Sequence, residues 1–179
     1  MSDFSLYFPM LLNYEGIVFE NVKDDPGGAT KMGITLDDFR HNGYDINKDG
    51  LIDVNDLKLM TKDDAFKIYK KEYWDRLKAD QITNQNIANI LCDFSVNCGL
   101  SVSIRKVQSL LSLNGDGIFG NNTLGCVNNA DGSKLFESIK NIRLKYYNDI
   151  INYNPKLEKF RKGWETRVLS FIYKKNYEK

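Results

Sequence analysis

The sequence is poor in the residues that most readily reveal a site. Among its 179 residues there is a single histidine, His41, in a polar stretch typical of an exposed helix end, so any catalysis would have to proceed without histidine. The three cysteines are odd in number and form no C-x-x-C pair, which argues against a disulfide framework. No internal repeat, low-complexity tract or linker is present. The sequence therefore predicts a single globular domain over residues 1–179.

An excess of charge of one sign is missing as well, and so are long apolar runs. Lysine and arginine number 25 against 24 acidic residues, which gives a formal net charge of +1. Nucleic-acid-binding proteins usually carry a basic stripe, so this balance does not support a nucleic-acid partner. The N-terminus reads MSDFSLYFPMLLNYEG, with an acid where a signal peptide has a basic residue and with Pro9 breaking the apolar run. We expect a chain made in the cytoplasm, without a signal peptide and without stable membrane insertion.

Apolar residues recur at helical spacing along most of the chain. Residues 17–34 are instead rich in Val, Phe, Gly and Asp, which predicts a small irregular hairpin. Thr61 and Asp64 stand at the spacing of a capping box at the start of a helix. The fold class that follows is mainly α (α+β), with helices around a small N-terminal β-hairpin region. We expect one helix from Pro9 to Gly16 and others over residues 61–74, 86–99, 101–115, 133–154 and 163–175.

Two carboxylates and a hydroxyl, those of Glu15, Asp24 and Thr30, stand around a tight D-D-P-G-G turn. Cleavage of a glycosidic bond needs a proton donor at the bridging oxygen, and a glutamate in a partly apolar setting suits that role because desolvation keeps it protonated. Asp24 would then activate or hold a water, and Thr30 would orient it. The spacing alone is weak evidence, because an acid near such a turn is more often only a cap followed by a turn.

The segment EGIVFENVKDDPGGATKMGIT resembles the signature of glycoside hydrolase family 108, which reads E-G-G-Y, D-D-P-G-G-x-T and G-I-T. The resemblance continues in order through IYKKEYWD, DFSVNCG, VQSLL, DGIFGNNTL and FRKGWETRV. The last of these segments are similar to a region described as peptidoglycan-binding. One departure in the first motif is Ile17, which stands where the family has a second glycine.

This resemblance implies a lysozyme-like fold and an N-acetylmuramidase (lysozyme) that degrades peptidoglycan without a catalytic cofactor. It places the catalytic acid on Glu15, and the set of Glu15, Asp24 and Thr30 resembles the triad of bacteriophage lysozymes. Glu20 is the rival acid, but it lies in a more polar run. Residues 1–90 would form the catalytic part and residues 91–179 a helical peptidoglycan-binding part. Inversion is favoured if Asp24 only activates water, and the stereochemistry stays open.

Three further residues are candidates for contact with the sugar. Tyr73 and Trp74 could stack on pyranose rings, an interpretation that the family resemblance favours, although aromatic residues at helical spacing are more often part of a core. Asn97 could bind an N-acetyl group, or it could cap the helix that ends before Gly99.

Residues 45–56, DINKDGLIDVND, have the spacing of an EF-hand loop, with Gly50 at the sharp turn. The loop resembles more closely that of dockerins, which also end in Asp where EF-hands have Glu. We expect a structural Ca²⁺ site with Mg²⁺ as a competitor, and the alternative is a solvated acidic turn. The predicted ligands are oxygens of Asp45, Asn47, Asp49, Leu51 (its carbonyl), Asp53 and Asp56.

The setting that these features favour is a bacteriolytic phage or prophage endolysin, a monomer that reaches the cell wall in the periplasm through a holin or another export route. A cell-encoded wall-remodelling or secreted effector muramidase is a second setting. A non-catalytic peptidoglycan-binding protein is the alternative from another class, and it would have no need for the triad. A dockerin-type module is weaker still, because only one loop of that kind is present.

Overall fold

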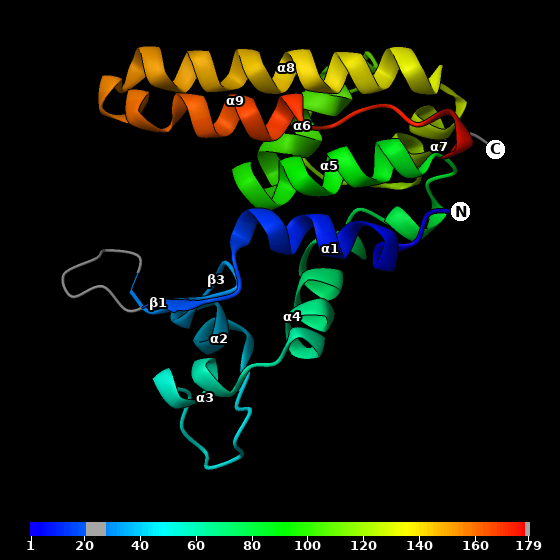
Figure 1. Cartoon of the computed structure of the whole chain (residues 1–179). Helices are drawn as coiled ribbons and strands as arrows, with labels where there is room; N and C mark the ends of the chain where they lie inside the picture. Colours follow the sequence, from blue (N-terminus) through cyan, green and yellow to red (C-terminus); the bar gives the residue numbers. More distant parts are fainter. Residues whose placement is uncertain (21–27, 178–179) are drawn as a thin grey trace. The chain divides into compact units, whose positions relative to one another are not determined.

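The computed structural model describes residues 1–20 and 28–177, which divide into two compact units (Figure 1). Residues Ser5–Lys70 form one, here called the small unit, and Met1–Phe4 with Lys71–Lys179 form the other, the large unit. In the described part of the chain, no helix is both long enough and apolar enough to span a membrane.

The prediction of a mainly α protein with a small β element near the N-terminus is confirmed. Three antiparallel strands lie early in the chain, and short 3-10 or π turns (η) punctuate the helices. In chain order the elements are α1 Phe4–Glu15, β1 Phe19–Glu20, β2 Thr30–Lys31, β3 Ile34–Thr35, α2 Leu36–Asn42, α3 Val54–Leu59, α4 Lys62–Tyr69, η1 Lys70–Trp74, η2 Ala79–Gln81, α5 Gln85–Cys98, α6 Leu100–Leu110, α7 Asn121–Asn129, α8 Gly132–Tyr153, η3 Pro155–Phe160, α9 Arg161–Leu169 and η4 Lys175–Tyr177.

The first helix begins earlier than the sequence predicted. We expected Pro9 to open it, but α1 starts at Phe4 and contains Pro9 as an exposed interior residue. Apolar side chains before and after the proline, among them Tyr7 and Leu11, are buried on one face, and this burial outweighs the backbone hydrogen bond that a proline removes. Gly16, at φ +75°, ends the helix as predicted, with its N–H donating to the carbonyl of Leu12 over 3.0 Å.

The sheet of the small unit is a meander in the order β1-β2-β3. Strands β2 and β3 pair with Thr30 opposite Thr35, so that only Met32 and Gly33 connect them. Both connecting residues have positive φ, +51° and +73°, as a two-residue type I′ hairpin turn requires. The helices that follow begin with capping boxes, including the predicted box of Thr61 and Asp64 at α4.

The large unit is helical, and α9 runs back along α8 (Figure 1). Helix α5 is buried along most of its length and ends at Gly99, as predicted. The last long helix is shorter than expected: α9 ends at Leu169, not near residue 175. Phe171 is buried beyond that end, and Asn86 of α5 bonds both the N–H and the carbonyl of Lys174, at 2.8 and 3.0 Å. These contacts fix the following segment in an extended course that a continued helix could not follow.

Candidate active site

Glu15 is the last residue of α1, and its carboxyl group lies directly against the β2–β3 turn of the small unit. A Cβ atom placed on Gly33 would be 2.5 Å from Oε2 of Glu15 and 2.8 Å from its Cβ. Those separations are far below van der Waals contact, so only glycine allows the turn to approach the acid this closely. Glu15 is half-buried in this position.

The turn that supports Glu15 is itself held by Tyr69 of α4. The phenol of Tyr69, which is buried, donates a hydrogen bond of 2.8 Å to the carbonyl of Met32. A non-glycine residue in the left-handed region costs about 1–2 kcal/mol. Met32 has a φ of +51°. Burial of its side chain, which is 3% exposed, and the hydrogen bond to its carbonyl offset this cost. Gly33 stands in the G-I-T motif, but nothing in the sequence indicated that it would touch Glu15, or that Tyr69 would hold the turn.

Replacement of Gly33 by Ala is expected to lower the rate of peptidoglycan hydrolysis about 10- to 100-fold. The new methyl group would lie 2.5 Å from Oε2 of Glu15 and 2.6 Å from the hydroxyl of Tyr69, so it displaces the carboxyl group and the phenol that holds the turn. Initial rates on purified cell walls and thermal melting would be measured together. Gly43→Ala is the matched control, since Gly43 has a φ of +72° but no atom within 4 Å of a new Cβ. Equal losses of activity in both variants would show that backbone strain, not displacement of Glu15, is responsible.

Of the other two members of the predicted triad, the structure describes only Thr30. Thr30 lies on β2, where its hydroxyl donates to the carbonyl of Ile34 over 3.2 Å and keeps its lone pairs as acceptors. Asp24 lies outside the described residues. The rival acid Glu20 is exposed on β1, where it pairs with Thr30.

The three predicted sugar contacts all belong to the large unit. Trp74 is 0% exposed, donates from its indole nitrogen to Asp80 over 2.5 Å and packs on Phe4 at 5.2 Å. The structure therefore places Trp74 in the core, and stacking on a sugar would require its ring to be uncovered. Tyr73 is half-buried in η1.

Asn97 does not cap its helix. Its Oδ1 accepts a hydrogen bond of 2.5 Å from the phenol of Tyr147, while α5 ends through the N–H of Gly99 and the carbonyl of Ser95. Asn97 is half-buried, so part of its side chain reaches the surface.

Behind Asn97 lies a buried ionic cluster that joins α5, α8 and α9. Asp93, which is 0% exposed, accepts hydrogen bonds from Arg143 at 2.7 Å and from Arg167 at 2.8 Å. Burial alone would lower the pKa of Arg143, but Asp93 and Tyr147 beside it raise the pKa overall, so the guanidinium stays charged. The sequence placed Asp93 and Arg167 only within the DFSVNCG and FRKGWETRV segments and did not single out Arg143, because charged side chains are rarely buried and no local pattern pairs them.

In the 45–56 loop the predicted ligands mostly bond to the loop's own backbone. Asp56, fully buried, accepts from the N–H groups of Ile46, Asn47 and Asp53 at 2.8–3.1 Å. The hydrogen bond from Asp53 lowers the pKa of Asp56 most strongly. Asp45 accepts from Gly50 through Oδ2.

The side chains of Asn47 and Asp49 bond to each other, and Asp53 caps α3. Within residues 1–20 and 28–177, no three His, Cys, Asp or Glu side chains converge closely enough to hold a metal ion. Within the loop, Oδ1 of Asp45 is a buried oxygen without a hydrogen-bond partner in the structure.

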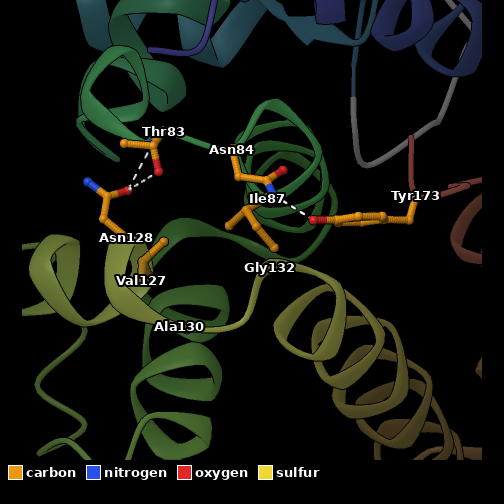
Figure 2. A pocket seen from close by; sticks show the side chains of 8 residues that line it. All are labelled: Thr83, Asn84, Ile87, Val127, Asn128, Ala130, Gly132 and Tyr173. Carbon is orange, nitrogen blue, oxygen red and sulfur yellow. Dashed lines mark hydrogen bonds between the residues drawn. The ribbon is translucent and has the colours of Figure 1, made fainter. Parts of the chain in front are cut away.

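A pocket of about 250 Å³ opens in the large unit (Figure 2). Its polar groups are largely bonded to one another: Asn84 donates to the phenol of Tyr173 at 2.7 Å, and Asn128 accepts from the N–H of Thr83 at 3.0 Å. These bonds tie the start of α5 to α7 and to the segment after α9, which gives the pocket a structural role.

The small unit thus holds a half-buried carboxyl group against a hydrogen-bonded turn, next to a strand that carries a hydroxyl group. The chain belongs to the glycosyl hydrolase 108 family, whose model matches residues 8–99. A second model, described as a predicted peptidoglycan domain, matches residues 102–169. Together they make this chain a glycoside hydrolase with peptidoglycan as its substrate.

A solved structure, that of SagA from Brucella abortus, shares the fold with a TM-score of 0.75. The two chains are 24% identical, and the match covers 97% of each. Among curated proteins, none matches this chain.

Proposed function

We propose that the protein is an N-acetylmuramidase that hydrolyses the β-1,4 bond between N-acetylmuramic acid and N-acetylglucosamine in peptidoglycan. The observation that carries this proposal is the contact of the Glu15 carboxyl group with Gly33, inside the segment that matches the hydrolase family. A proton donor must be held steadily at the bridging oxygen, and the turn of Met32 and Gly33 gives Glu15 a fixed support.

In the proposed reaction, Glu15 gives its proton to the bridging oxygen, which leaves with N-acetylglucosamine. A water attacks C1 of the muramic acid and loses its proton to Asp24, while the hydroxyl oxygen of Thr30 accepts a hydrogen bond from that water. One bond to C1 breaks as one forms on the opposite face, so the product inverts its configuration. Inversion in glycosidases goes with carboxyl groups about 6.5–9.5 Å apart.

Product analysis of digested peptidoglycan tests this proposal. Purified sacculi would be incubated with the protein, and the fragments analysed by mass spectrometry with and without borohydride reduction. New reducing ends on muramic acid would support the assignment. New reducing ends on glucosamine would identify a glucosaminidase, and an absence of new ends would leave peptidoglycan binding as the protein's role.

We further propose that the 45–56 loop binds a structural Ca²⁺. Its support is the spacing of oxygen ligands in the sequence together with the buried, unpartnered Oδ1 of Asp45, which a hard cation would satisfy. The ion would take no part in the chemistry and would fix the chain between the hairpin and α4.

Ca²⁺ at millimolar concentration is expected to raise the melting temperature by several degrees relative to chelator, because the ion binds the folded loop and not the unfolded chain. Asp45→Asn should abolish this shift. The exposed Asp63→Asn, which removes the same charge outside the loop, should keep it. Identical melts with and without Ca²⁺, in a protein purified free of metal, would refute the site.

The biological setting proposed is lysis of a host wall by a phage or prophage endolysin. A hydrolase region followed by a peptidoglycan-recognising region suits that role. Wall remodelling by a cell, or delivery as a secreted effector, would use the same chemistry. Expression in a bacterial host with and without a holin separates the settings: lysis that depends on the holin supports the endolysin.

A further inference from the structure

The hydrogen bonds behind Asn97 dictate which way its side-chain amide points. Arg143 can only donate, and its Nε donates to the phenol of Tyr147 over 2.7 Å. The phenol has two further neighbours, Oδ1 of Asn97 at 2.5 Å and Sγ of Cys98 at 3.6 Å. Sulfur is a weak acceptor, so the phenol proton goes to Oδ1 of Asn97. Sγ of Cys98 lies 3.5 Å from the same Oδ1 of Asn97. The amide oxygen of Asn97 thus faces inward and its NH₂ group faces away from the cluster.

This orientation is fixed across the pH range in which the protein would work. Burial raises the pKa of Tyr147 well above its usual value, so the phenol keeps the proton that it donates to Asn97. Burial likewise raises the pKa of the Cys98 thiol. In the described part of the chain, Nδ2 of Asn97 makes no hydrogen bond, which leaves two oriented donors on a partly exposed side chain.

An aromatic stack lies beside the same phenol ring. The indole of Trp164 is stacked on Tyr147, with ring centroids 4.9 Å apart and planes at 24°. Phe160 stacks on Trp164 in turn, at 5.6 Å and 26°, and is 44% exposed. The stack therefore rises from the buried Tyr147 to the surface, and Trp164 and Asn97 both lie against Tyr147.

The chemistry of this arrangement matches one group of the substrate. An acetamido group is planar and offers a carbonyl oxygen as acceptor and a methyl group as apolar surface. The NH₂ of Asn97 would donate to the carbonyl. The methyl group would rest on the edge of the half-buried indole of Trp164, because Tyr147 and Phe160 stack on the indole. We propose that Asn97 and Trp164 form a subsite for the acetamido group of an N-acetylated amino sugar, with Tyr147 and Arg143 as positioning residues. This deepens the proposed function by naming the part of the peptidoglycan that the large unit recognises.

Binding of glycan strands tests the subsite independently of the cleavage step. Strands freed of their stem peptides would be used in native form and after enzymatic de-N-acetylation, so that a peptide carbonyl cannot serve as the ligand. Calorimetric titrations would use the full chain carrying Glu15→Gln, to measure affinity without turnover. We expect the native strands to bind at least about tenfold more tightly than the de-N-acetylated strands.

Asn97→Asp is the decisive variant, because the carboxylate still accepts from Tyr147 but offers no donor to the sugar. It should lower the affinity for native strands about tenfold, whereas de-N-acetylated strands, whose free amines are cationic, should bind no more weakly than they bind the parent. Asn141→Asp, which adds the same charge at an exposed position of α8, should bind as the parent does. Equal affinity of the parent for both strands, or unchanged affinity in Asn97→Asp, would overturn the subsite. Neither result would bear on the assignment of Glu15 as the acid or on the products of cleavage, which are tested separately.

Tyr147→Phe tests the positioning role. Without the phenol the amide of Asn97 can turn over, so the preference for native over de-N-acetylated strands should shrink. A purely structural role for Tyr147 would lower both affinities together and leave their ratio unchanged, which would refute positioning.

Discussion

Glu15→Gln is expected to lower the rate of peptidoglycan hydrolysis by about 10²- to 10⁴-fold, the contribution typical of a positioned general acid. Glutamine keeps the shape of the side chain that rests on Gly33, so the turn and α1 should be undisturbed. What is lost is the proton for the bridging oxygen. The melting temperature should therefore stay within about 2 °C of the parent, because only the chemical group at a half-buried position has changed.

Glu20→Gln is the matched control for this prediction. Glu20 is the rival acid five residues along the chain, it is exposed on β1, and its substitution makes the same change of charge. It should retain nearly full activity. Release of reducing ends from purified sacculi would be followed for both variants. A large loss in Glu20→Gln with activity kept in Glu15→Gln would move the acid to Glu20.

Features of the fold that depend on neighbours in the sequence could be predicted from it. The capping box of Thr61 and Asp64, the end of α5 at Gly99 and the end of α1 at Gly16 all follow from local backbone chemistry. The start of α1 could not be placed in the same way, because Pro9 is a strong local signal against a helix interior. Burial of the α1 face, a tertiary effect, outweighs that signal.

The site depends on contacts between distant residues, which no local pattern contains. Tyr69 reaches Met32 across 37 positions, and that bond holds the turn on which Glu15 rests. Asn97 meets Tyr147 across 50 positions, and its donor direction follows from that partner together with Arg143, which donates to the same phenol. A sequence motif can mark Glu15 or Asn97 as a candidate, but the supports that orient each of them become visible only once the chain is folded.

Asp93→Ala is expected to destabilise the protein by about 3–5 kcal/mol, because it leaves Arg143 and Arg167 buried without the carboxylate that accepts from both. For a chain of this length such a loss lowers the melting temperature by roughly 6–20 °C. Thermal and denaturant unfolding followed by circular dichroism would measure it. Glu158→Ala removes an ion pair of the same 2.7 Å separation at the surface, with Arg161, and should change the melting temperature little.

A triple variant separates two roles that Asp93 could have, one in the stability of the fold and one in the orientation of Asn97. Replacing the whole cluster by apolar residues, as Asp93→Leu, Arg143→Met and Arg167→Leu together, should recover much of the lost stability, because no buried charge is left unpaired. A triple variant as unstable as Asp93→Ala would contradict this and would make the ionic cluster itself essential for folding.

If stability is regained, the reason for burying these charges must lie elsewhere. The phenol of Tyr147 would then have lost the donor that fixes its proton, and the preference for N-acetylated strands should fall even though the fold is sound. On this argument the cluster serves to orient Asn97, because apolar side chains could join the three helices in its place.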